Sequence, residues 1–130
     1  MPQTYPRPWS LVPGLVGAMI ARRQRSFHRD AQAAVHLLKP PLEIRGREHI
    51  PASGPFLLTI NHYGRLGFPS WWLTMTPSSA LPVEVHWVMT GAWVFLDRWY
   101  TGLVRDSTRW LFWQVAGVYG FYNMTPIAPY

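Results

Sequence analysis

The stretch that decides the fold runs from residue 46 to residue 62 and reads Gly46-Arg47-Glu48-His49-Ile50-Pro51-Ala52-Ser53-Gly54-Pro55-Phe56-Leu57-Leu58-Thr59-Ile60-Asn61-His62. Residues 51–55 carry the Pro, Ser and Gly of a turn, and residues 56–60 are an apolar run of strand length. The run ends at a polar pair, Asn61-His62, which leads into a glycine-containing loop. Because α/β folds place functional side chains where strands end, we predict an active site at this pair.

Strand-like and helix-like patterns alternate on both sides of this stretch. Short strands are predicted at residues 42–45, 56–60, 83–89 and 117–122. Helices are predicted at residues 69–76, where Pro69 suits a first helical position, and at 96–115, with a Pro- and Ser-rich loop over 76–82. This alternation with short links predicts an α/β fold, an αβ sandwich.

The first 39 residues divide into an extended, Pro-rich tail over 1–14 and a basic amphipathic helix over 15–39. At 100° per residue, one face of this helix collects apolar residues: Ile20, Phe27, Ala31, Ala34, Val35 and Leu38. The opposite face collects Arg22, Arg25, Arg29 and His36, and Lys39-Pro40-Pro41 ends the helix. Two interpretations follow: a helix that lies on anionic lipid head groups, or an ordinary domain helix with a solvated basic face.

Composition limits the classes of protein to which the chain can belong. Its 130 residues suffice for one domain, the net charge is +6, and eight of the residues are Trp, an amphipathic side chain that suits a membrane interface. With no Cys, the chain forms neither disulfides nor thiolate metal sites, which fits a cytoplasmic or cytoplasm-facing protein. The apolar run over residues 9–21 is too short to span a bilayer, and its following positive charges do not fit a signal peptide.

The pattern Gly-x-Glu-x-Ile-Pro-x-x-Gly-Pro, followed by an apolar strand and Asn-His, resembles the glycerolipid acyltransferases of the lysophosphatidic-acid type over residues 42–125. The resemblance implies that residues 40–130 are the N-terminal part of a glycerol-phosphate acyltransferase-like αβ sandwich. It also implies transfer of a fatty acyl group from acyl-CoA or acyl carrier protein, with no cofactor, to a lysophospholipid or glycerol-phosphate hydroxyl. His62 would be the general base, and Asn61, Tyr63, Gly64 and Arg65 would bind substrates.

The sequence departs from the family inside the catalytic motif. The family's His-x-x-x-x-Asp pattern has Gly67 at the Asp position, and its small hydroxyl residue two positions after the His is Gly64. Its later Phe-Pro-Glu-Gly block is absent from the sequence. We therefore expect a truncated member with little activity of its own, peripheral to the cytoplasmic face of an anionic membrane. The alternative is a lipid-binding remnant of the fold without catalysis.

Other interpretations have less support in the residues. A carboxylate elsewhere in the chain could replace the missing Asp; the candidates are Glu48, Glu84 and Asp97. The remaining histidines, His28, His36, His49 and His86, lack the clustered spacing of a metal site, so no metal is predicted. Nucleic-acid binding would rest on charge alone, because no recognised motif appears, and no nucleic-acid partner is predicted.

Overall fold

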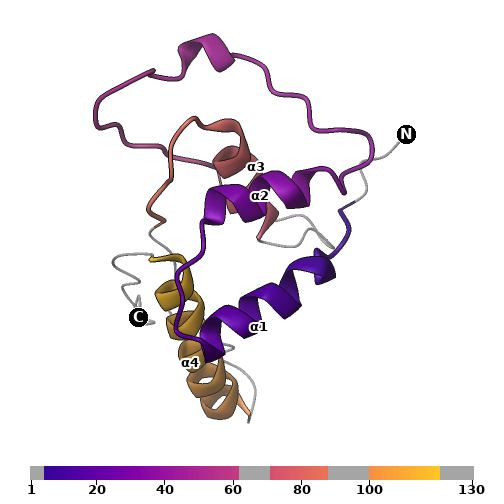
Figure 1. Ribbon diagram of the computed structural model, residues 1–130, viewed down its shortest axis with the longest axis vertical. Helices are drawn as coiled ribbons and strands as arrows, with labels where there is room; N and C mark the ends of the chain where they lie inside the picture. The colour runs from indigo at the N-terminus through magenta and orange to yellow at the C-terminus, as the bar shows by residue number, and fades with distance from the viewer. Residues whose placement is uncertain (1–4, 62–70, 88–99, 121–130) are drawn as a thin grey trace. The chain divides into compact units, whose positions relative to one another are not determined.

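The structure, a computed structural model, describes residues 5–61, 71–87 and 100–120. It contains a short 3-10 helix at Trp9–Leu11, α1 at Val12–Ile20, α2 at Phe27–Val35, a second 3-10 helix at Arg47–His49, α3 at Trp72–Ala80 and α4 at Thr101–Tyr119 (Figure 1). These elements belong to two compact units. Unit 1 combines Met1–Leu11 with Ser26–Val85, and unit 2 combines Val12–Arg25 with His86–Tyr130.

The predicted αβ sandwich is wrong for the described part of the chain, which is helical and contains no β-strand. Residues 42–45, 56–60 and 83–87 are loop, and residues 117–119 belong to α4. A strand is stable only beside a partner, and within these ranges the backbone of residues 51–61 makes no hydrogen bond. Apolar composition alone therefore did not make residues 56–60 a strand.

The predicted single helix over 15–39 is two helices, α1 and α2, which belong to different units. The break is a Schellman motif: the Arg23 N–H bonds Ala18 O at 2.9 Å, and the Arg22 N–H bonds Met19 O at 3.3 Å. Arg22 takes the left-handed conformation, with φ 50°, in the position that glycine usually fills. The tail is also shorter than predicted, since the 3-10 helix begins at Trp9 and Pro13 lies in the first turn of α1.

Unit 1 is built around the contact between α2 and α3 (Figure 1). The buried residues of α2 recur at helical spacing and are Phe27, Asp30, Ala31 and Ala34, followed by Leu38. From α3, Trp72, Met75 and Ser78 are buried, with Trp72 at 0% exposure. The apolar face predicted for residues 27–38 is therefore the core of unit 1, as in the interpretation of an ordinary domain helix.

α3 continues through the predicted loop over 76–82 as far as Ala80, with Pro77 inside it. Proline removes one backbone donor, so this helix lacks the bond that residue 77 would make. Side chains supply local hydrogen bonds instead: Thr76 Oγ1 donates to Trp72 O at 2.7 Å, and Ser79 Oγ donates to Thr76 O at 2.8 Å. Burial of Trp72 and Met75 against α2 compensates for the poor helix propensity of this segment.

Unit 2 is built around the contact between α1 and α4, and the link after α1 joins the same unit. The Arg25 N–H donates to Val118 O at 2.8 Å, which satisfies a carbonyl of the last turn of α4. Gly120 then ends α4 with φ 63°, a conformation that glycine adopts without a Cβ clash. Ala116 and Val118 are the buried residues of α4.

Candidate functional site

The candidate site begins with the long segment between α2 and α3, which Figure 1 shows as an arc containing one 3-10 helix, Arg47–His49. Gly46 precedes this helix with φ 77°, and Gly54 has φ 87° in the following turn. Both values lie in the left-handed region that favours glycine, so the two glycines of the Gly-x-Glu-x-Ile-Pro-x-x-Gly pattern have a structural role as turn residues.

Residues 55–61 form a loop that is exposed except at the half-buried Phe56. Leu57 is 90% exposed, and Asn61, the predicted substrate-binding residue, is also exposed. Of the other predicted site residues, His62, Tyr63, Gly64 and Arg65 lie outside the described residues, as does Gly67. The structure therefore places Asn61 at the surface, and Asn61 is the predicted site residue that it describes.

Two of the carboxylates considered as replacements for the missing Asp have partners of their own. The Glu48 carboxylate lies 3.6 Å from His49 Nε2 on an exposed turn. Glu84 accepts hydrogen bonds through both oxygens, as described next, and Asp97 lies outside the described residues. The structure thus pairs Glu48 with its neighbour His49 and Glu84 with the start of α2.

A polar cluster in unit 1, which the sequence reasoning missed, joins the start of α2 to residue 84. Glu84 Oε2 accepts from Ser26 Oγ at 2.8 Å, and Glu84 Oε1 accepts from the His28 backbone N–H at 3.1 Å. Ser26 Oγ also accepts from the Arg29 N–H at 3.0 Å, as an N-cap residue does. The carboxylate beside the first turn of α2 is favourably placed with respect to the helix dipole.

His28 adds a further bond within this cluster. Its Nδ1 lies 2.7 Å from Ser78 O, and a carbonyl oxygen only accepts, so Nδ1 carries the proton. The Ser26 hydroxyl is occupied as donor and acceptor, and its contact is a carboxylate rather than an imidazole, so the pair lacks the nucleophile-and-base geometry of acyl-enzyme chemistry. The cluster is structural: it attaches the segment after α3 to the start of α2.

We expect Ser26→Ala to lower the free energy of unfolding by about 1 kcal/mol, because it removes the N-cap acceptor and the donor to Glu84. Urea denaturation followed by circular dichroism measures this. The matched control is Ser79→Ala in α3, where the hydroxyl only donates to Thr76 O and alanine favours the helix. Equal losses in the two variants would show that the Ser26 cluster contributes no specific stability.

Two further findings concern metal binding and membrane spanning. In the described ranges, no group of three or more His, Cys, Asp or Glu side chains is arranged to hold a metal ion. None of the described helices combines the length and apolar character needed to cross a bilayer. Several of the exposed apolar residues lie on helices and form stripes along them.

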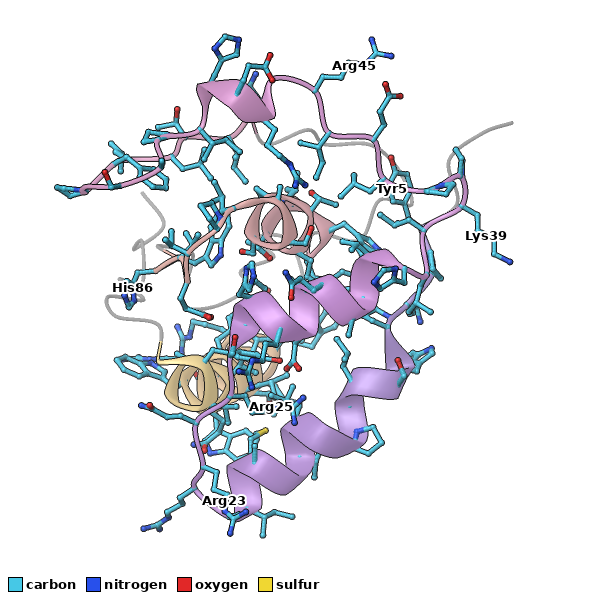
Figure 2. The ribbon with its side chains drawn as sticks, turned by 45° about the horizontal axis from the view of Figure 1, so that its top comes forward. Tyr5, Arg23, Arg25, Lys39, Arg45 and His86 are labelled. Atoms are coloured by element: carbon cyan, nitrogen blue, oxygen red, sulfur yellow. The ribbon has the colours of Figure 1, made fainter. Side chains whose placement is uncertain are left out.

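One such stripe lies on α1, where Val12, Val16 and Ile20 follow one another at four-residue intervals and are exposed by 40%, 45% and 80%. The exposed side chains of Arg22 and Arg23 follow directly after the helix. Figure 2 labels Arg23 and Arg25 in this link. The half-buried Arg25 lies against α1, because a Cβ added at Gly14 would be 2.7 Å from its Nη1.

The cationic face predicted from Arg22, Arg25 and Arg29 is therefore not formed by one helix. Arg22 lies in the turn after α1, Arg25 packs against α1, and Arg29 belongs to α2 in the other unit. The arginines that follow the exposed stripe on α1 are Arg22 and Arg23.

Comparison of the chain with protein-family models, with curated proteins and with solved structures gives no match in any of the three.

Proposed function

We propose that this protein transfers a fatty acyl group from acyl-CoA or acyl carrier protein to a lysophospholipid or glycerol-phosphate hydroxyl, with His62 as general base. The observation that carries the proposal is the sequence over residues 46–62, in which the pattern Gly-x-Glu-x-Ile-Pro-x-x-Gly-Pro and an apolar run precede Asn61-His62. The left-handed conformations of Gly46 and Gly54 support it, because they explain why this pattern has glycine at both positions. The exposure of Asn61 is compatible with access by a substrate.

In the proposed reaction, the neutral imidazole of His62 takes the proton of the acceptor hydroxyl while that oxygen attacks the thioester carbonyl. A carbon–oxygen bond forms, the carbon–sulfur bond breaks, and the departing thiolate takes the proton back from the imidazolium. Asn61, Tyr63, Gly64 and Arg65 would hold the substrates, with the Arg65 guanidinium suited to phosphate oxygens.

The test is incorporation of a labelled acyl group from acyl-CoA into a panel of lysophospholipids presented in vesicles. The proposal expects a phospholipid product whose formation depends on His62. Absence of product from every acceptor and from both acyl-CoA and acyl carrier protein donors would contradict it.

The proposed place of this reaction is the cytoplasmic surface of an anionic membrane, and the support comes from α1. Its stripe of Val12, Val16 and Ile20 gives an apolar face, and Arg22 and Arg23 follow where they can meet lipid phosphates. Each arginine near such a surface contributes about 1 kcal/mol of attraction. Because the apolar face of α2 is buried in unit 1, α1 rather than α2 would make this contact.

We expect Arg22→Gln/Arg23→Gln to lower the affinity for anionic vesicles by roughly 30-fold at low salt, from two lost interactions of about 1 kcal/mol each. Sedimentation with vesicles of phosphatidylglycerol and phosphatidylcholine measures the affinity. The control variant, Arg45→Gln/Arg47→Gln, removes the same charge from exposed positions of unit 1. Equal weakening in both variants would show that net charge, not the end of α1, attracts the protein.

A second candidate function is lipid binding without chemistry, and Gly67 at the position of the family's Asp favours it. Glycine cannot orient an imidazole or stabilise the imidazolium that forms during attack. Vesicle binding together with no acyl transfer, and no effect of His62→Ala on either, would favour this candidate over the first.

A further inference from the structure

The outer face of α4 carries a second set of exposed apolar side chains, distinct from the stripe on α1. Leu103, Trp110 and Trp113 are exposed by 74%, 62% and 50%. Their spacings of seven and three residues place them within about 80° of arc on a helix with 3.6 residues per turn. The buried residues of α4, Ala116 and Val118, show that this helix has an inner side as well.

The charged side chains of α4 sum to a net positive charge, which favours an anionic partner. The acidic residue of α4 is Asp106, and the basic residues are Arg105 and Arg109. Arg105 Nε donates to Asp106 Oδ1 at 2.9 Å. This bond holds the pKa of Asp106 below its usual value, against the opposing effect of desolvation, and the charges of Arg105 and Arg109 also lower it. Asp106 thus stays ionised but paired, and the helix keeps a net positive charge.

The surface also changes from apolar to polar over a short distance. A shallow hollow of about 570 Å³ is lined by two polar residues, Asp106 and Ser107, and by two apolar ones one turn later, Trp110 and Leu111. The boundary between acyl chains and head groups has the same polarity gradient, and the indole ring, with an apolar body and one N–H donor, is the side chain that concentrates there. Arginine side chains beside such residues can extend their guanidinium groups toward lipid phosphates.

We propose that the outer face of α4, formed by Leu103, Trp110 and Trp113, inserts into the interfacial region of an anionic lipid bilayer. The inference rests on the membrane location proposed above and adds a second contact in unit 2. The partner is a lipid surface rather than a second copy of the chain, because the net positive charge of α4 would repel an identical helix and attract anionic lipid.

The experiment compares Trp110→Gln/Trp113→Gln with a matched control, Trp9→Gln/Trp71→Gln, which removes two exposed indoles from unit 1. Binding to phosphatidylglycerol-containing vesicles is measured by sedimentation, and circular dichroism checks that both variants keep their helix content. We expect affinity to fall at least tenfold in the α4 variant and less than threefold in the control. Vesicles with brominated acyl chains should quench the tryptophan fluorescence of the wild type and of the control more than that of the α4 variant.

Four results would overturn the inference. Equal affinities for the α4 variant and the control would show that these tryptophans do not enter the lipid. A wild type that is dimeric without lipid, and an α4 variant that is monomeric but binds vesicles normally, would assign the face to a second copy. If the α4 variant binds normally while Arg22→Gln/Arg23→Gln does not, this inference fails and the proposed membrane location stands. If the wild type does not bind anionic vesicles at all, both fail.

Discussion

His62→Ala is expected to lower the rate of acyl transfer to a lysophospholipid by about 10²–10⁴-fold, the range that a positioned general base contributes. Alanine cannot accept the proton of the attacking hydroxyl, whereas vesicle binding through α1 and α4 should stay unchanged. The measurement is the initial rate with labelled acyl-CoA at saturating acceptor. His49→Ala is the control, because this imidazole is exposed on a turn beside Glu48. A rate unchanged by His62→Ala would remove the general-base role.

Gly67→Asp extends the same experiment to the missing carboxylate. If His62 is a working base without a partner, an Asp five residues later should orient the imidazole and raise the rate, and the gain should disappear in the double variant with His62→Ala. A folded Gly67→Asp protein with no gain over wild type would favour the lipid-binding candidate.

Trp72→Ala is expected to lower the free energy of unfolding of unit 1 by about 3–5 kcal/mol, the usual cost of truncating a buried aromatic residue. Trp72 is fully buried between α2 and the tail, and its Nε1 donates to Pro6 O at 3.1 Å. The variant loses the packing, leaves a cavity and leaves that carbonyl without its donor. Urea denaturation followed by circular dichroism measures the loss, which is close to the whole stability of a small unit.

The neighbouring residue provides the control for this prediction. Trp71 precedes α3 and is 38% exposed, so Trp71→Ala should cost under about 1 kcal/mol. Similar losses in the two variants would show that Trp72 is not the centre of the core of unit 1.

Sequence patterns predicted the parts of the fold that depend on local spacing. The buried face of α2, with Phe27, Ala31 and Ala34, followed from helical periodicity, and most of α4 lies within the helix predicted over 96–115. Glycines with left-handed conformation occur in the predicted turn at Gly54 and at the start of the motif at Gly46. The signals for these features, helical periodicity and turn residues, are local in the chain, although α3 supplies the burial of α2.

Where a feature depends on contacts between distant residues, the sequence-based prediction was wrong or the feature was missed. The break after α1 occurs at Arg22, which gives no glycine or proline signal, and the helix through Pro77 depends on the burial of Trp72 against α2. Residues 56–60 have strand composition but no described strand beside them. Ser26 falls inside the helix predicted over 15–39, and its partner Glu84 is 58 residues away, so no local pattern indicated this hydrogen bond. His62 and the residues after it lie outside the described ranges, so the catalytic part of the site stays a prediction.

The division of the chain between the two units has a practical consequence for mapping function by deletion. The chain changes unit after Leu11, after Arg25 and after Val85, so each unit is assembled from separated pieces. Removing the first 25 residues takes α1 from unit 2 and also takes the Pro6 acceptor of Trp72 from unit 1. Removing everything after Val85 leaves α1 without α4. Truncation from the N-terminus would therefore damage both units, and truncation after Val85 would remove most of unit 2. Point substitutions, or a permuted chain that joins the pieces of one unit, can assign an activity to one of them.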